Sequence, residues 1–360
     1  MPVILWELII FPIMKKMKIE ILNKSLLKIH SLAILATCLA CGTDEDKADE
    51  SKIKFTKRPE PVWEGTYTAA DPSVIRDGDT LRMYYSSLVL EPEEKLVIAG
   101  AKSIDGIHWL PANEVEDAES IALSVTPGTW DDHLEAVSVI KSGSELWMYY
   151  CGYPDEADAV GKIVAEGEIG LAKSSNTVTF TREFNEPILS LGDLNTKDAN
   201  ALFSPTIIKE GSTYYMLYVG YCIEDCSPGF IGILGATSTD GENWTKLTDP
   251  VISGSDFNLN WAEVIKEPAI VKGPDNVYYL FISGDTGIGV ARSNSILGPY
   301  EVYPEPILKK EHDWESYSVI APTVIIENNT VRMWYMGVTV SGTGADFAIG
   351  YAESAFPLNW

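Results

Sequence analysis

The sequence predicts an all-β fold, a five-bladed β-propeller. The first observation is a phrase that recurs five times: an apolar run, a polar turn containing Gly or Asn, and an aromatic-rich apolar run. This is the pattern of a β-hairpin. The second observation is a strand–turn–strand phrase that follows every hairpin, and the third is the lack of a competing helical period. Four antiparallel strands repeated five times indicate a propeller.

The hairpin phrases begin at equivalent positions, as in "DPSVIRDGDTLRMYYS" and "SPTIIKEGSTYYMLYVG". Their first residues, called the slot residues below, are Asp71, Ala136, Ser204, Glu267 and Ala321, which are 65, 68, 63 and 54 residues apart. The phrase after each hairpin, such as "EIGLAKSSNTVTF", predicts a third strand with small residues, a turn, and an aromatic residue that opens a fourth strand. Fourth strands close on "EPILS" (186–190), "DPVIS" (249–253) or "EPILK" (305–309).

The two ends of the repeat array complement each other. The chain stops at Trp360, where the fourth strand of blade five should begin. At the other end, "FTKRPEPVWEG" (55–65) reads like the fourth-strand segment "FTREFNEPILS" (180–190). We therefore expect residues 55–63 to complete blade five by pairing with the segment that ends near Ala352, which removes an exposed sheet edge. The predicted propeller domain is 55–360.

Residues 1–41 have the composition of a targeting segment and are set aside from the fold. Lys15, Lys16 and Lys18 precede the short apolar run "SLAILATCLAC", which is too short to span a bilayer permanently. The segment resembles a bacterial lipoprotein signal, and this resemblance implies that Cys41 is lipidated. Residues 42–54 then form an acidic tether. The expected location is the cell envelope, as an outer-membrane lipoprotein that is periplasmic or surface-exposed.

The formal charge of -25 makes nucleic acid and anionic lipid surfaces unfavourable partners. We therefore expect no nucleic-acid partner, membrane attachment only through the lipid anchor, and a monomer. After the signal, the chain keeps Cys151, Cys222 and Cys226. The spacing "CIEDC" fits a small loop disulfide with Cys151 free, and three unpaired thiols fit equally well.

The slot residues are the first candidate site. In a propeller the innermost strands crowd around the axis, so the residue before each "P-S/T-x-V-I" run is expected to face a shared pocket. Carboxylates at Asp71 and Glu267, among small neutral residues, suggest that this pocket requires charge. The alternative is local: Asp71 caps a turn before Pro72, and Glu267 pairs with Lys266.

The hairpin phrase of Asp71 and the segment "EPAIVKGPDNVYYLFISGD…IGVARSNSILGPYEVYPEPIL" resemble the five-bladed propeller glycoside hydrolases, above all glycoside hydrolase family 43. That family contains arabinanases, arabinofuranosidases and β-xylosidases. The resemblance implies Asp71 as general base and Glu267 as the nearest match to the general acid. The family's Glu stands one residue further from the proline, and its auxiliary acid on blade three is replaced here by Ser204. No cofactor is required; some relatives hold a central calcium, for which the sequence has no dedicated motif.

A second candidate acid lies on blade two. Glu135 precedes its apolar run by two places, as the family's acid does, while Asp198 and Glu263 lie further out on loops. His133 alternates with Glu135 and so is a candidate for the same pocket, although a surface or turn position is the simpler interpretation. Four tryptophans stand 6 to 8 residues before a slot and are candidate platforms for sugar rings: Trp63, Trp130, Trp261 and Trp314. Packing between blades is their alternative role.

The sequence thus predicts a glycoside hydrolase for a plant or algal poly- or oligosaccharide. One carboxylic acid would protonate the leaving oxygen while a carboxylate activates water, with inversion as the expected outcome. The alternative is a non-catalytic surface glycan-binding lipoprotein. It would keep the aromatic pocket and lack a working carboxylate pair.

Overall fold

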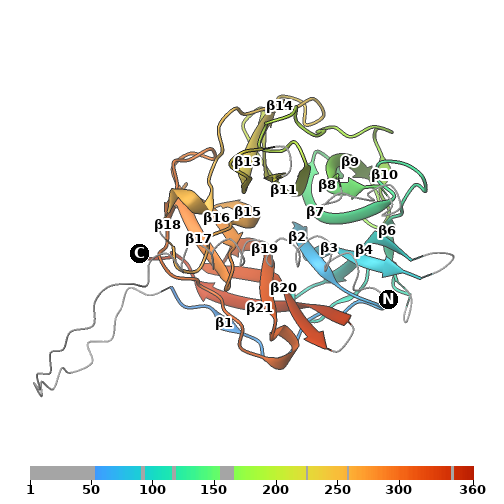
Figure 1. The fold of residues 1–360 in the computed structure, drawn as a ribbon. Coiled ribbons are helices and arrows are strands. Elements are labelled where there is room, and N and C mark those ends of the chain that lie inside the picture. Colours follow the sequence, from blue (N-terminus) through green and yellow to red (C-terminus); the bar gives the residue numbers. More distant parts are fainter. Residues whose placement is uncertain are drawn as a thin grey trace, which may run out of the picture.

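A computed structural model describes residues 53–90, 94–115, 119–154, 166–223, 226–257, 259–341 and 344–360. They form five antiparallel sheets arranged in a ring around a central axis, so the predicted five-bladed β-propeller is confirmed (Figure 1). The predicted signal with Cys41, and most of the tether, lie outside the described residues. Within the described part of the chain, no helix combines the length and apolar character that a membrane span requires.

Each blade is a meander whose first strand lies at the axis (Figure 1). Blade one contains β2 (Ala70–Asp77), β3 (Thr80–Val89), β4 (Lys95–Ser103) and β5 (Leu110–Pro111), with β6 (Ile121–Leu123) also paired to β4. Blade two contains β7 (His133–Ser142), β8 (Glu145–Tyr153), β9 (Glu168–Ser174) and β10 (Thr181–Arg182). Blade three contains β11 (Ala201–Glu210), β12 (Thr213–Cys222), β13 (Phe230–Ser238) and β14 (Thr245–Lys246).

Blade four contains β15 (Lys266–Lys272), β16 (Tyr278–Ser283), β17 (Ile288–Ser293) and β18 (Glu301–Val302). Blade five contains β19 (Ser318–Glu327), β20 (Thr330–Ser341), β21 (Gly344–Ala355) and, from the start of the propeller domain, β1 (Thr56–Lys57). Two short 3₁₀ turns, η2 (Gly254–Asp256) and η3 (Asp313–Glu315), precede the first strands of blades four and five.

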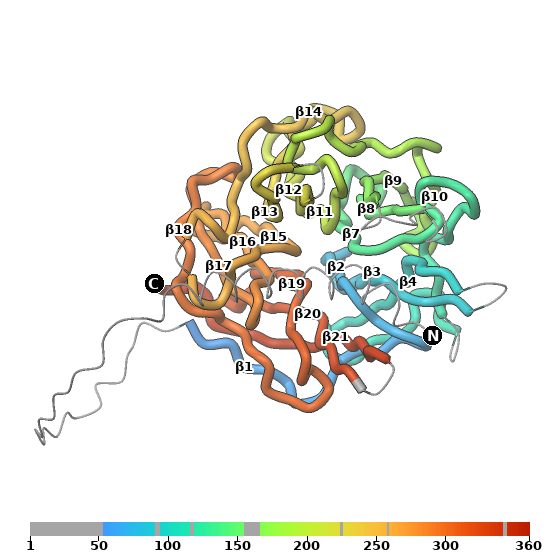
Figure 2. Tube along the Cα trace, in the orientation of Figure 1, coloured from blue at the N-terminus to red at the C-terminus, as the bar shows by residue number. Residues whose placement is uncertain are grey.

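The ring closes as the sequence predicts. In β1, Thr56 pairs with Glu353 and Lys57 with Ala352 of β21, and Trp63 bridges to Ile349. Figure 2 shows β1, in blue, beside the red end of the chain. The join is also electrostatic: Lys57 forms an ion pair with Glu315, and both side chains are buried. The N-terminal strand therefore holds the last blade in the ring.

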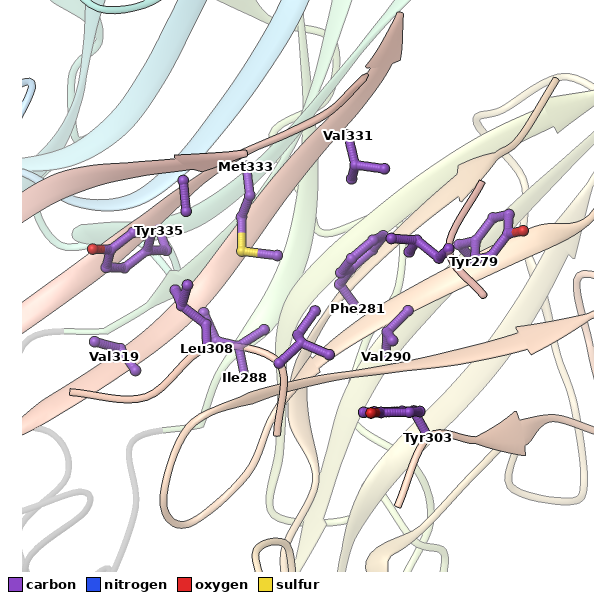
Figure 3. Close-up of a cluster of buried hydrophobic side chains, with 13 residues drawn as sticks. Tyr279, Phe281, Ile288, Val290, Tyr303, Leu308, Val319, Val331, Met333 and Tyr335 are labelled. Carbon is purple, nitrogen blue, oxygen red and sulfur yellow. The ribbon is translucent and has the colours of Figure 1, made fainter. Parts of the chain in front are cut away.

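The core lies between the blades. Each pair of neighbouring blades encloses one hydrophobic cluster, because both faces of every sheet pack against another sheet. Figure 3 shows the cluster between blades four and five, where Phe281 and Val290 of one blade meet Met333 and Tyr335 of the next. The strands consequently read as continuous apolar runs rather than alternating ones; all six residues of β16 are buried.

Buried hydroxyls tie the inner strands together around the axis. A backbone N–H of one inner strand donates to a Ser or Thr of the preceding blade in four places: Val139 to Ser73, Ile207 to Ser138, Ile270 to Thr206, and Val74 to Thr323. The equivalent residue of blade four is Ala269, so the link from blade four to blade five lacks its hydroxyl. This ring fixes the inner strands, and hence the slot residues, relative to one another.

The open question about the cysteines is resolved within the described residues. Cys222 and Cys226 form a disulfide, and Cys151 is unpaired and buried.

Candidate active site

All five slot residues share an unusual backbone conformation. Their φ angles are 47° at Asp71, 45° at Ala136, 47° at Ser204, 52° at Glu267 and 50° at Ala321, in the left-handed region that normally favours glycine. At each slot the pairing of the first two strands shifts, so that two residues oppose one. The slots are therefore five copies of one β-bulge, the device that re-aims side chains next to functional sites.

The bulges bring the slot residues to one pocket at the axis. The pocket is lined by each slot residue and the residue after it: Asp71, Pro72, Ala136, Val137, Ser204, Pro205, Glu267, Pro268, Ala321 and Pro322. The empty space among these residues is about 300 Å³, open solvent at its mouth included. The slots thus meet at one place, and the small residues at three of them leave room beside the two carboxylates.

Asp71 lies half-buried in this pocket. Its Oδ2 accepts the hydroxyl proton of Ser86 at 3.0 Å. Burial raises the pKa of Asp71 above its ordinary value and the charge of Glu267 adds to this, while Ser86 and Lys266 oppose it. Burial and the charge of Glu267 therefore favour the protonated form of Asp71, whereas Ser86 and Lys266 favour its ionised form.

Glu135 lies on β7, directly before the slot of blade two; it is not among the residues that line the axial pocket, but its charge interacts with that of Asp71. Burial raises the pKa of Glu135, the charge of Asp71 raises it further, and the Tyr153 hydroxyl beside it acts in the opposite direction. His133 stacks on Tyr153 with ring centroids 5.3 Å apart and accepts the Leu96 N–H at Nδ1. His133 is buried at the start of β7, so it is neither a surface nor a turn residue, and it does not line the axial pocket.

Glu267 supplies the third carboxylate, from blade four. Its Oε2 accepts the Ala321 N–H at 3.0 Å, an interaction that ties it to the slot of blade five. Lys266 precedes it and pairs with Ser283 in the hairpin, as Glu135 pairs with Cys151. The position directly before the slot therefore holds a lysine on blade four and a glutamate on blade two.

The four tryptophans that were candidate platforms for sugar rings do not line the axial pocket. Three of them donate an indole N–H outward, to the segment that carries the fourth strand of their own blade: Trp130 to Asn185, Trp261 to Pro304 and Trp314 to Pro59. Trp63 bridges to β21 and meets Tyr85 edge to face. None of the four lines the axial pocket. The reason is shape, because glycines in or next to the second and third strands leave hollows that the indoles fill, as Gly284 after β16 and Gly289 of β17 do at Trp261.

The outlying acids also have structural partners. Asp198 accepts hydrogen bonds from Tyr218 and Lys246, so it anchors β14 in blade three. Glu263 is exposed on its loop, where its N–H donates to Asp285. Ser204 lines the pocket as predicted for its slot, without a carboxylate.

Two residues of the site were not found in the sequence. Both lie on the second strand of their blade and act on a carboxylate of the first strand: Ser86 acts on Asp71, and Tyr153 acts on Glu135. The available signal is positional: once the hairpins are aligned, Ser86 stands opposite the residue before the slot, and Tyr153 stands opposite His133 at the start of β7. In the described part of the chain, no group of three or more His, Cys, Asp or Glu side chains is placed to hold a metal ion.

No protein-family model matches the sequence, and no curated protein matches it. Solved structures do share the fold. A glycoside hydrolase that is 18% identical has a TM-score of 0.62 and matches 84% of this chain and 94% of its own. A thermostable family-43 glycoside hydrolase, 17% identical, has a TM-score of 0.54 and matches 78% of this chain and 88% of its own.

A third structure carries different chemistry. An N-acetylgalactosamine deacetylase from F. plautii, solved in complex with blood group B trisaccharide, is 15% identical, with a TM-score of 0.58 over 83% of this chain and 96% of its own. At such identities the likeness establishes the fold alone. Function has to be argued from the axial pocket.

Proposed function

We propose that this protein is a glycoside hydrolase whose reaction takes place in the axial pocket. The observation that supports the proposal most is that Asp71 and Glu267, from two blades, line one axial pocket. Glu135, from a third blade, lies close enough for the charges of both to raise its pKa. Carboxylic acids buried close to one another cannot all be ionised, so one of them retains a proton near neutral pH. A retained proton beside an ionised carboxylate is the pair that glycoside hydrolysis requires.

The environments suggest how the roles divide. Asp71 has Ser86 and Lys266 to favour its ionised form, so it is proposed as the general base. Glu135 is proposed as the general acid, because both neighbouring carboxylates act to keep it protonated. Glu267, held by a backbone N–H, is the auxiliary carboxylate that sustains that proton.

In the proposed reaction Glu135 transfers its proton to the glycosidic oxygen as the bond from the anomeric carbon to that oxygen breaks. Asp71 accepts a proton from the water that forms the new bond to the anomeric carbon. The anomeric centre inverts if this water attacks the face opposite the leaving group. Exchange of both protons with solvent restores the starting state. The substrate class we propose is a plant or algal poly- or oligosaccharide.

The test is a hydrolysis screen with aryl furanosides, aryl pyranosides and plant and marine oligosaccharides, with the anomer of the first product followed by ¹H NMR. Asp71→Asn is the paired variant. We expect it to remain folded and to lose hydrolysis by about 10²–10⁴-fold, the range that a general base typically contributes. Full activity in Asp71→Asn would remove the base role.

A second candidate function is glycan binding without turnover, favoured by Ser204 in the blade-three slot, where the resembled family has its auxiliary acid. Isothermal titration calorimetry with the same oligosaccharides separates the two. Binding with no product after prolonged incubation, and equal affinity in Asp71→Asn, would favour the binding protein over the hydrolase.

We also propose that the protein is a lipid-anchored protein of the cell envelope, with Cys41 as the lipidated residue. Cell fractionation of wild type, Cys41→Ala and Cys38→Ala tests this. Loss of the membrane-associated form in Cys41→Ala alone is the expected result. Unchanged fractionation in that variant would contradict the anchor.

A further inference from the structure

One position of the second strand differs systematically between the blades. The residue that pairs with the position before the slot is Ser86 in blade one, Cys151 in blade two, Val219 in blade three, Ser283 in blade four and Met336 in blade five. A hydroxyl stands there only in blades one and four. These are the two blades whose slots carry carboxylates, Asp71 and Glu267.

The hydrogen bonds of Ser86 define where its proton points. Ser86 Oγ accepts the Ala136 N–H at 3.1 Å, so one lone pair faces the slot of blade two. A hydroxyl has a single proton to donate, and the Asp71 Oδ2 at 3.0 Å is the acceptor. Ser86 is itself only 2% exposed, so water does not compete for the bond. The backbone beside Glu135 thus orients the hydroxyl that contacts Asp71.

We propose that Ser86 is a positioning residue, which fixes the Asp71 carboxylate in the pocket and keeps Asp71, rather than Glu135, as the proton acceptor of the pair. The assignment of Asp71 as base rests on the proposed function. The contact between Ser86 and Asp71 does not depend on the proposed function, because it follows from the hydrogen bonds that Ser86 makes with Asp71 and Ala136.

Ser86 favours the ionised form of Asp71 because a hydrogen bond from a hydroxyl to an ionised carboxylate is stronger than one to a neutral carboxylic acid. The other groups acting on Asp71 are charged or titratable: Glu135 of β7, Cys151 and Tyr153 of β8, and Lys266 and Glu267 of β15. Among them Lys266 favours the ionised form of Asp71 and Glu267 opposes it. Ser86 is the neutral donor that acts on Asp71 without adding charge to the pocket.

The test measures Asp71 directly and needs no substrate. The protein is labelled with ¹³C at the aspartate carboxyl carbons, the Asp71 signal is assigned by its loss in Asp71→Asn, and its chemical shift is followed across pH. We expect Ser86→Ala to move the Asp71 titration upward by about one pH unit, the size that follows from losing one hydrogen bond to a charged group. Ser86→Thr keeps the hydroxyl and should titrate as wild type.

Ser73→Ala is the matched control. Ser73 is also buried in blade one and also accepts an N–H from blade two, that of Val139 at 3.0 Å, without contacting Asp71. Its removal should lower the melting temperature and leave the Asp71 titration in place. If Ser86→Ala does not fold, Ser86→Cys replaces it, because Cys151 already occupies the equivalent position in blade two.

An Asp71 titration that is the same in wild type and in Ser86→Ala, or in Ser86→Cys if Ser86→Ala does not fold, would overturn the proposal, whatever the substrate screen gives. An upward shift would support it even if no hydrolysis is found, because the titration does not depend on turnover. Where hydrolysis is found, the acidic limb of kcat/KM should move in the same direction.

Discussion

Glu135 and Lys266 occupy the same position in two different blades. Each directly precedes a left-handed slot residue, and each pairs across its first hairpin, Glu135 with Cys151 and Lys266 with Ser283. One blade therefore presents a carboxylate, and the other an ammonium group, at equivalent points of the ring. The resemblance to family 43 implies an acid on the blade that here carries the lysine, whereas the proton donor proposed for this protein belongs to blade two.

The first prediction separates Glu135 from Glu267 as general acid. A substrate with a good leaving group, such as a dinitrophenyl glycoside, needs little protonation of its leaving oxygen, whereas an alkyl glycoside needs full protonation. We expect Glu135→Gln to retain most activity on the dinitrophenyl glycoside and to lose about 10²–10⁴-fold on the alkyl glycoside. The measurement is kcat/KM for both substrates in Glu135→Gln and Glu267→Gln.

Glu267→Gln serves as the control because it also removes one carboxylate from the pocket. It should lower both rates by a similar factor. If Glu267→Gln shows the leaving-group dependence instead, the acid stands on blade four and the assignment to blade two is wrong.

The second prediction concerns stability and pH. Asp71 and Glu135 have pKa values raised by burial and by mutual repulsion in the folded protein. Between the ordinary carboxyl pKa of the unfolded chain and the raised folded value, the folded state binds more protons, so stability falls as pH rises across this window. Glu135→Gln removes one such group and relieves the other. Relative to wild type it should gain up to about 1.4 kcal/mol for each pH unit in the window.

Urea unfolding at pH values from 4 to 8 measures this difference, and other titrating groups cancel between the two proteins. Glu60→Gln, at an exposed position, is the matched control and should run parallel to wild type. A constant offset between Glu135→Gln and wild type at all pH values would mean that Glu135 is not held protonated.

The architecture of the blades was predictable because its signals are local. The hairpin of Asp77 to Thr80 and its four equivalents show turn residues between apolar runs, and such patterns specify strands and turns without long-range information. Ring closure was predictable for a related reason. The segment that pairs Thr56 with Glu353 reads like the fourth strands of other blades, so its place in the ring followed from the repeat.

The geometry of the site was only partly predictable. The slots were identified by their place before the inner strands, but the left-handed conformation of Asp71 and Glu267 has no glycine to signal it. The side-chain direction of Trp261 was not predictable either. An indole at that position fits a sugar platform or an interior hollow equally well. The outcome depends on Gly284 and Gly289, which lie about 20 to 30 residues later in the chain.

The third prediction follows from the hollow under Trp261. This side chain is 4% exposed and its indole N–H donates to Pro304 at 3.0 Å. Trp261→Ala should cost about 3–5 kcal/mol of unfolding free energy, the usual cost of truncating a buried aromatic. Under conditions where the variant remains folded, its affinity for a bound oligosaccharide should equal that of wild type. Phe184→Ala, at an exposed ring on blade two, is the control and should change neither the unfolding free energy nor the oligosaccharide affinity. Weaker oligosaccharide binding in folded Trp261→Ala would mean that Trp261 does belong to the binding site.

The fourth prediction concerns the closure of the ring. Lys57 of β1 pairs with Glu315, whose side chain is fully buried and also accepts the Tyr335 hydroxyl at 2.8 Å. Lys57→Met leaves a buried carboxylate without its cation, so we expect a loss of about 3–5 kcal/mol in unfolding free energy. The double variant Lys57→Met/Glu315→Gln should recover a large part of this loss, because the uncompensated charge is gone. Lys54→Met, an exposed position just before β1, is the matched control and should be neutral. Equal stability of Lys57→Met and wild type in urea unfolding would mean that β1 is not held by this pair, and the closure would then rest on strand pairing and apolar packing alone.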